Sequence, residues 1–427
     1  MRRFHSASPE FDTEFGGFLD IRRRSTTDLE PVVAEILGAV RSDGLSAVLR
    51  YTEQFDRVRL DAASLRVTSD EIDAGVAGCA PDVLEALKFA AGRIAKYHAR
   101  QIPGDLRFVD DLGVSLGWRW RPVDSVGLYV PGGRAAYPSS VLMNALPAAV
   151  AGVERIVMVT PPGRLDPAVL AAASLASIDE IWRIGGAQAI GALAYGAGPI
   201  RPVDKIVGPG NAYVTTAKRL VYGHVGIDGI AGPSEIVVVA DRTNDPRWIA
   251  ADLLSQAEHD PDAQCILITD TDAYATLVEQ CLGQHLQTLP TAETARQAWR
   301  DHGAIVVAPL VEVPRIVDLI APEHLELAIE RPEELAELIR HAGAIFMGRF
   351  TPEAIGDYVA GSNHVLPTHR SARFASGLSV FDFLNRSSLL NCTPSAFEQL
   401  ADATEVLTRT EGLPAHTLSI TVRRPRS

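Results

Sequence analysis

Apolar and polar positions follow two different periods along the chain, which divides it into a helical first part and a later part of mixed strands and helices. Residues 29–55 and 80–101 carry apolar side chains at spacings of three and four, the period of an amphipathic helix. A helix with one apolar face needs a partner surface, so we expect both segments to pack against a sheet.

Short apolar runs typical of buried strands begin near residue 125 and alternate with helical segments. In the first series the strand-like runs are VGLYV, RIVMV, DEIWRI and DKIVG, and the helical ones include AQAIGALAYG and NAYVTTAKRLVY. A second series of the same kind extends from EIVVVAD at 235–241 to AGAIFMG at 342–348. Strands that alternate with helices predict parallel sheets. The predicted fold class is α/β, with two doubly wound, incomplete Rossmann-like domains, a helical N-terminal region and a small C-terminal tail domain.

The regular pattern ends at about residue 379, where a short polar tail begins. Residues 389–412 are predicted to be partly helical, and the run HTLSITVRR at 416–424 resembles a strand. A segment this small cannot bury a core of its own. We therefore expect the tail to pack on a neighbour, such as another subunit.

Composition and charge narrow the class of protein without identifying it. With 427 residues, 47% of them hydrophobic and 22% charged, the chain has the composition of a soluble globular protein of two or three domains. The net charge of −13 opposes binding to nucleic acid or to an anionic membrane surface. The most apolar segment, 139–159, is interrupted by Asn144, Pro147, Glu154 and Arg155, so no transmembrane span is predicted. We expect a cytoplasmic protein.

The four cysteines, Cys79, Cys265, Cys281 and Cys392, form no C-x-x-C motif and no disulfide-rich spacing. They are predicted to be reduced thiols. Cys265 lies in the apolar run AQCILITD, where a small buried core residue is the favoured interpretation over a nucleophile.

Glycine-rich turns follow or precede several strands of the first series, at 131–133, 185–186, 208–210 and 232–234. The G-x-G-x-x-G fingerprint is absent, but ligands of open α/β sheets bind at such turns, beyond the carboxyl ends of strands. Gln188 and Asn211 begin helices after two of these turns, and Tyr129 precedes a third. Each turn alone is explained by ordinary turn chemistry. Together they favour a nucleotide-sized ligand, for which a sugar phosphate is an equal alternative.

Gln256 and His259 are three residues apart in a predicted helix, so their side chains lie on one face. With Asp357 and His416, found far along the chain, they would offer one amide oxygen, one carboxylate and two imidazoles. That donor set suits Zn²⁺. The alternatives are a solvated helix face for the first two, a cap near Gly356 for Asp357 and an ordinary loop histidine for His416.

Glu323 and His324 place a carboxyl group beside an imidazole, which suits proton transfer from an alcohol or activation of water. They follow Ala321 and Pro322, and since proline is tolerated in the first turn of a helix, both are predicted to begin a short helix. The alternative is a carboxylate that only stabilises the helix dipole.

Several motifs occur in the order and spacing of one enzyme family. They are VGLYVPGGRAAYPSSVLMNALPA, GGAQAIGALAYG, KIVGPGNAYVTTAK, AGPSEIVVVAD, LLSQAEHDP, APEHLEL, GDYVAGSNHVLPT and EGLPAHTLS. Across residues 125–416 the chain resembles the histidinol dehydrogenase family. It departs from the family at Gly229 and Ile230, where Met-Pro is usual, and this departure lies near the implied substrate residue Ser234 and away from the implied metal ligands.

The resemblance implies oxidation of L-histidinol through L-histidinal to L-histidine, with two NAD⁺ used in turn at one site. His324 would remove the alcohol proton and Glu323 would activate the water that hydrates the aldehyde. The implied zinc ligands are Gln256, His259, Asp357 and His416, and these four residues and His324 would also contact the substrate. Further substrate contacts are implied for Ser234, His364 and Glu411. NAD contacts are implied for Tyr129, Gln188 and Asn211.

The resemblance also implies an intertwined homodimer with shared active sites, in which Glu411 and His416 come from the partner chain. The expected organisation is an N-terminal arm at 1–22, an α/β domain with the zinc and acid-base residues at 23–126 and 236–378, an α/β domain that binds NAD at 127–235, and a swapped tail at 379–427.

Three other functions remain as alternatives. A paralogue could apply the same zinc and NAD chemistry to another small amino or sulfonated alcohol. A zinc hydrolase without a nucleotide would use Glu323 or His324 on a metal-bound water. A two-lobed binding protein would bind histidinol or a nucleotide without turnover.

Overall fold

The structure is a computed structural model, and it describes residues 1–23, 29–132, 137–163 and 165–424. The chain divides into two compact units, the first made of Met1–Gln101 and Asp124–Phe383 and the second of Ile102–Val123 and Leu384–Ser427. Within the described ranges, no helix has both the length and the apolar character needed to cross a membrane.

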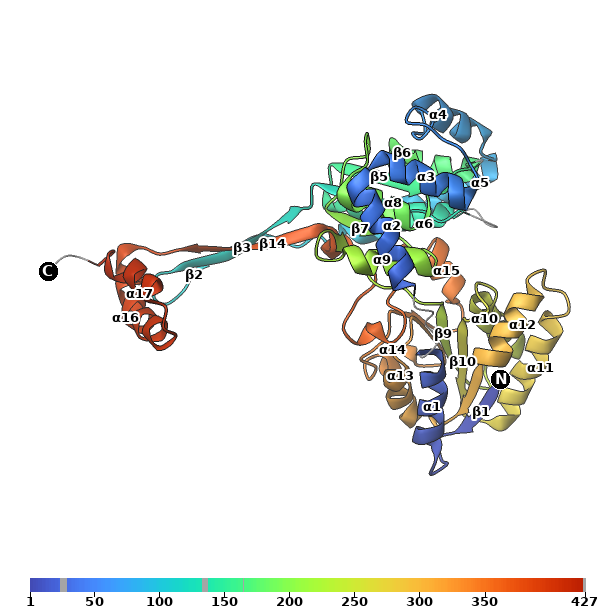
Figure 1. Cartoon of the computed structure of the whole chain (residues 1–427). Coiled ribbons are helices and arrows are strands. Elements are labelled where there is room, and N and C mark those ends of the chain that lie inside the picture. The colour runs from blue at the N-terminus through green and yellow to red at the C-terminus, as the bar shows by residue number, and fades with distance from the viewer. Residues whose placement is uncertain (24–28, 133–136, 164, 425–427) are drawn as a thin grey trace. The chain divides into compact units, whose positions relative to one another are not determined.

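The first unit contains a six-stranded parallel sheet in the order β1-β11-β10-β9-β12-β13. Figure 1 labels its strands β1, β9 and β10. Its strands are β1 (Arg2–His5), β9 (Glu235–Ala240), β10 (Gln264–Thr269), β11 (Ala304–Val307), β12 (His324–Ala328) and β13 (Ala344–Met347). Strands β9, β10 and β12 are buried along their whole length, because helices cover both faces of the sheet. Burial on both faces explains why these strands read as continuous apolar runs in the sequence.

Two helical layers enclose this sheet. The helices associated with it are α1 (Phe11–Arg23), α10 (Pro246–Ala257), α11 (Asp272–His285), α12 (Ala292–His302), α13 (Val313–Ile320), α14 (Pro332–Ala336) and α15 (Glu353–Tyr358), with the 3-10 turn η1 (Leu310–Glu312). One core cluster joins α1 and α13 to the sheet, and the other joins α10, α11 and α12 to its opposite face. The segment 1–22, predicted to be an N-terminal arm, contributes edge strand β1 and most of helix α1. Its aromatic residues carry that packing, since Phe15 is fully buried against Phe4, Phe11 and Phe18.

A second parallel sheet of the first unit has five strands in the order β6-β5-β4-β7-β8. These are β4 (Ser125–Tyr129), β5 (Arg155–Thr160), β6 (Glu180–Arg183), β7 (Lys205–Val207) and β8 (Gly226–Ile227). The helices around it are α2 (Glu30–Asp43), α3 (Leu45–Asp56), α4 (Ser69–Gly78), α5 (Pro81–Ala99), α6 (Pro138–Ala151), α7 (Pro167–Leu175), α8 (Gly186–Tyr195) and α9 (Ala212–Val221). The α/β class with parallel sheets is confirmed.

The N-terminal helices α2–α5 pack with this second sheet, although residues 23–126 were expected to belong with 236–378. The apolar stripe of α2 shares a core with α8, and a Cβ on Gly191 would lie 3.2 Å from side-chain atoms of Leu37 and Val40. A larger residue at this position would require these side chains to shift by a few tenths of an ångström. The amphipathic pattern predicted that these helices cover a sheet, but it carries no information on which of two sheets they cover.

The second unit is a three-stranded antiparallel sheet with two helices. Strands β2 (Leu106–Val109), β3 (Ser115–Pro122) and β14 (Leu384–Asn391) pair in the order β14-β3-β2, and helices α16 (Pro394–Thr410) and α17 (Pro414–Thr421) follow. Short 3-10 turns η2 (Ser371–Arg373) and η3 (Val380–Phe383) precede β14 within the first unit. The strand predicted at 416–424 is wrong. Pro414 fixes the first turn of a helix there, and Thr417 bonds Thr408 of α16 at 2.8 Å.

Candidate active site

The pair Glu323 and His324 lies at the amino end of β12, and the predicted short helix is wrong. Helix α13 ends before them at Ile320, and Ala321, which caps its C-terminus, adopts a left-handed conformation with φ of 49°. His324 is the first residue of β12 and pairs with Ile236 and Ala344 of the two neighbouring strands. The apolar run that follows it supplies a central strand, and that long-range pairing outweighs the local preference of Pro322 for a helix start.

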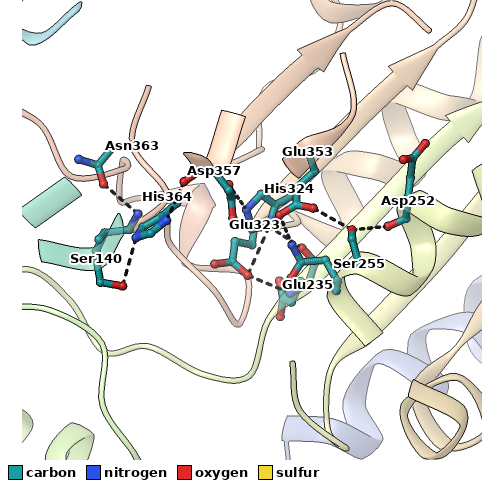
Figure 2. A network of polar contacts seen from close by, with 12 residues as sticks. Ser140, Glu235, Asp252, Ser255, Glu323, His324, Glu353, Asp357, Asn363 and His364 are labelled. Carbon is teal, nitrogen blue, oxygen red and sulfur yellow. Dashed lines mark hydrogen bonds and ion pairs between the residues drawn. The ribbon is translucent and has the colours of Figure 1, made fainter. Parts of the chain in front are cut away.

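Backbone atoms of Glu235, the first residue of β9, hold both members of the pair (Figure 2). The Glu235 N–H donates to the Glu323 carboxylate at 2.9 Å, and the Glu235 carbonyl lies 3.0 Å from His324 Nδ1. A carbonyl can only accept, so Nδ1 carries hydrogen and Nε2 is the ring nitrogen that faces the site. Nε2 lies 3.2 Å from Asp357 Oδ1.

Burial and neighbouring charge set the protonation of this pair. Burial raises the pKa of Glu323 to about 7. Burial alone would lower the pKa of His324, but the carboxylates of Glu323 and Asp357 outweigh it and raise that pKa to about 10. Near neutral pH the carboxyl group is therefore poised between its two forms, while His324 keeps its proton as long as the Asp357 charge faces it.

Gln256, at the end of α10, offers a buried oxygen that fits a cation. Its side chain is fully buried, and its Nε2 donates to Glu353 Oε1 at 2.6 Å. Its Oε1 has no hydrogen-bond partner among the residues that the structure describes. A buried amide oxygen without a partner is costly, so this atom is suited to coordinate a cation.

Carboxylates on α15 complete this side of the site. Glu353 and Asp357 are four residues apart and share one face of the helix, and their oxygens lie within 4.8 Å of each other and of a His324 ring nitrogen. Glu353 was not among the predicted site residues. The i, i+4 spacing of two carboxylates in EAIGDY was the available signal, and it is too common on exposed helices to be selected alone.

Two further predicted residues join this cluster from loops. His259, just after α10, is accessible to solvent, and desolvation of its ring lowers its pKa while the charge of Asp357 opposes that shift. His364 Nδ1 lies 3.0 Å from the Asp357 carbonyl and its Nε2 lies 3.5 Å from Ser140 Oγ (Figure 2). Desolvation lowers the pKa of His364 as well. Ser234 directly precedes Glu235 and is half-buried.

Glu411 and His416 lie in the second unit, at the C-terminal end of α16 and in α17, and both are exposed. The first unit therefore brings together Gln256, His259, Asp357, Glu323, His324 and His364, and it does not contain Glu411 or His416. Amide, imidazole and carboxylate donors around one orphaned oxygen fit a borderline ion such as Zn²⁺.

The predicted nucleotide residues lie at the carboxyl ends of strands in the five-stranded sheet. Tyr129 ends β4, and its hydroxyl accepts from the Gly186 N–H at 3.1 Å. Gln188, in the first turn of α8, is buried, and neither polar atom of its amide has a partner in the described part of the chain. Asn211 caps α9 by accepting from the N–H groups of Tyr213 and Val214, each at 3.1 Å. Gly133, in the predicted turn 131–133, lies outside the described residues.

Comparison with known proteins gives matches over nearly the whole chain. The family model described as histidinol dehydrogenase matches residues 20–424. A histidinol dehydrogenase of Caulobacter vibrioides is 63% identical over 100% of this chain and 99% of its own, and one of Rhodospirillum rubrum is 56% identical over 99% of each. The crystal structure of histidinol dehydrogenase from Elizabethkingia anophelis superposes with a TM-score of 0.94 at 36% identity, covering 99% of this chain and 98% of that one.

If this site binds Zn²⁺, the contact between Glu353 and Gln256 predicts how the affinity for the metal responds to substitution. If Glu353 only orients the amide, Glu353→Ala should weaken Zn²⁺ binding by about 10- to 100-fold, the usual effect of losing an outer-shell partner. Glu353→Gln keeps an oxygen acceptor for Gln256 Nε2 and should retain most of the affinity. Competition with a chromogenic chelator measures both constants, and Glu333→Gln on the exposed start of α14 is the matched control. Equal losses in both Glu353 variants would instead make Glu353 itself a ligand.

Proposed function

The chain belongs to the histidinol dehydrogenase family, and on that premise we propose that it oxidises L-histidinol through L-histidinal to L-histidine with two NAD⁺. Each turnover would consume one histidinol, one water and two NAD⁺ and release histidine, two NADH and three protons. The observation that carries the proposal is the buried pair of Glu323 and His324, both held by the backbone of Glu235, beside Asp357 and Gln256.

His324 is the base for the alcohol step in this proposal. Its Nδ1 is occupied by the Glu235 carbonyl, so Nε2 is the atom that would accept the hydroxyl proton while hydride leaves for NAD⁺. Accepting a proton requires a neutral ring, and the Asp357 carboxylate must therefore be engaged by another positive group at that moment. Gln256, His259 and Asp357 would hold zinc, with His416 as a fourth ligand. When bound, zinc supplies a fixed positive charge that holds the imidazole and amine of the substrate.

Glu323 is the base for the aldehyde step. As a carboxylate it would take a proton from water, which adds to the aldehyde and forms the hydrate from which the second hydride leaves. A thiol nucleophile is unnecessary for such a step. Cys265, which the sequence favoured as a core residue, is fully buried within β10 and joins none of the site contacts above.

NAD would bind at the turns that follow β4, β6 and β7. The unpartnered amide of Gln188 supports this assignment, since a buried amide of that kind fits the polar groups of a nucleotide. Ser234, His364 and Glu411 would contact the substrate. None of the four cysteines forms a disulfide within the described residues, which supports a reducing cytoplasmic location.

The protein would work as a homodimer whose active sites are shared. The support is the separate second unit, which carries Glu411 and His416 on exposed positions outside the unit with the other site residues. The paralogue that oxidises a different small alcohol is not favoured, because full-length relatives at high identity carry the histidinol dehydrogenase name.

Reaction stoichiometry and metal dependence test the function directly. A limiting amount of L-histidinol is added to the purified protein with excess NAD⁺, and NADH is measured by its absorbance. Each equivalent of histidinol should yield two equivalents of NADH. A chelator should abolish turnover and Zn²⁺ should restore it. A hydrolase or a binding protein would give no NADH, and metal-free protein that kept its full rate would exclude the zinc assignment.

The pKa of Glu323 predicts a pH profile. With L-histidinal as substrate, kcat/KM should rise as pH increases through about 7, because only the carboxylate form, present above that pKa, accepts a proton. Glu323→Gln should remove this rise and lower the rate by about 10²- to 10⁴-fold. The exposed neighbour Glu330 gives the control, since Glu330→Gln should keep both rate and profile. An unchanged profile in Glu323→Gln would contradict the assignment.

Mixed dimers test whether sites are shared between chains. Glu323→Gln and His416→Ala would each inactivate all sites of their homodimer. If His416 acts in the partner's site, a heterodimer has one doubly altered site and one intact site, so random mixing should restore about a quarter of wild-type activity. If each chain forms its own site, every site keeps one defect and mixtures stay inactive. Refolding the two variants together and separately makes the comparison.

A further inference from the structure

A buried ion pair in the five-stranded sheet has no role in the chemistry described so far. It joins Lys218 of α9 to Asp228, just after β8, and only 4% and 6% of the two side chains are exposed. Moving two charges out of water is costly, and apolar residues of similar size often stabilise a fold as well. The hydrogen bonds that Lys218 and Asp228 make to other groups should therefore explain why the pair is present.

Both partners bind the same residue, Gly208. Lys218 Nζ donates to the Gly208 carbonyl at 2.9 Å, and the Gly208 N–H donates to Asp228 Oδ2 at 2.8 Å. The two peptide groups that flank this glycine are thus fixed from both sides by charged partners. Hydrogen bonds of this charge-assisted kind are shorter and stronger than neutral ones.

Gly208 begins the turn Gly208–Asn211, which follows β7 and leads into α9. Its φ is +112°, and a Cβ there would lie 2.2 Å from the Tyr129 carbonyl oxygen. Asn211 ends the turn and caps α9. The ion pair thus fixes a turn that contacts one residue assigned to NAD and contains another.

Asp228 also contacts the segment of the chain that carries Ser234, a residue assigned to the substrate. Asp228 Oδ1 also accepts from the Gly229 N–H at 2.8 Å. Gly229 begins the segment that leads to Ser234 and Glu235. The backbone of Glu235 binds the acid-base pair Glu323 and His324. One buried carboxylate therefore fixes the start of both segments, and it does so beside Gly229 and Ile230, where the sequence departs from its family.

We propose that Lys218 and Asp228 are positioning residues that hold the Gly208–Asn211 turn in the conformation that binds NAD. This inference rests on the proposed function, since it assigns that turn to the nucleotide. Neither residue touches the reacting atoms. Their loss should weaken NAD binding more than it weakens the binding of histidinol or zinc.

The test compares Lys218→Met, which keeps the volume and removes the charge, with Asp228→Asn, which keeps an acceptor for the Gly208 N–H. Both variants should raise the dissociation constant of NAD⁺, measured calorimetrically on the zinc-loaded protein, by about 10- to 100-fold. KM for NAD⁺ should rise in parallel, with kcat at saturating NAD⁺ within about threefold of wild type. Lys218→Arg keeps the positive charge and should recover most of the affinity.

A second, half-buried ion pair of the same sheet supplies the control. Arg155 and Glu180 bond at 2.8 Å, with 16% and 15% of their side chains exposed, and Arg155 also binds backbone carbonyls of a loop. They lie at the first residues of β5 and β6, the amino end of the sheet. Arg155→Met should lower the melting temperature and leave NAD⁺ affinity unchanged.

The outcomes separate this inference from the proposed function. Wild-type protein that neither binds NAD⁺ nor forms NADH would refute the function itself. Wild-type protein that uses NAD⁺, with Lys218→Met and Asp228→Asn binding it equally well, would refute only the positioning role. Equal losses of NAD⁺, histidinol and zinc binding, or failure of both variants to fold where Arg155→Met folds, would show a general structural role and also overturn the inference.

Discussion

The pairing of β12 with β9 is the constraint on which the candidate site depends. It sets His324 opposite Ile236, and so brings the backbone of Glu235 within reach of both His324 and Glu323. One residue thereby fixes the ring orientation of the imidazole with its carbonyl and binds the carboxylate with its N–H. Because backbone atoms make both contacts, they depend on strand register and persist whatever side chain position 235 carries.

The carboxylates beneath this pair give the site its electrostatic character. Burial is the main cause that raises the pKa of Asp252 to about 6, of Glu353 to about 8 and of Glu326 to about 9, while the interaction with His324 lowers the pKa of Asp357 despite burial. Glu353 and Glu326 therefore hold protons at neutral pH, because a buried cluster of negative charges is unfavourable. A cation would compete with those protons, so its affinity should increase with pH.

Local patterns predicted those parts of the fold and site that are decided locally. The apolar runs predicted the strands. The three-residue spacing of Gln256 and His259 predicted that both side chains lie on one face of a helix, and the two residues lie at the end of α10 and just after it. The errors arose where distant partners decide the outcome. His324 joins a strand because β9 and β13 flank it, and Glu353 matters only because Gln256 of another helix donates to it. The β-branched residues of 416–424 have a high strand propensity, yet no neighbouring strand pairs with them in the described chain.

The two sheets present opposite ends to their candidate ligands, and helix polarity gives a physical reason. In the five-stranded sheet the candidate nucleotide residues lie where α8 and α9 begin, and the partial positive charge of helix N-termini suits the phosphates of a dinucleotide. In the six-stranded sheet the acid-base pair lies at the amino ends of β9 and β12, where α10 ends at Gln256 and Ala257. The partial negative charge of a helix C-terminus suits a cation. The candidate site for the anionic dinucleotide thus follows the rule that ligands bind at the carboxyl ends of parallel strands. The candidate cation site lies at the amino ends of its strands, where a helix C-terminus stabilises positive charge.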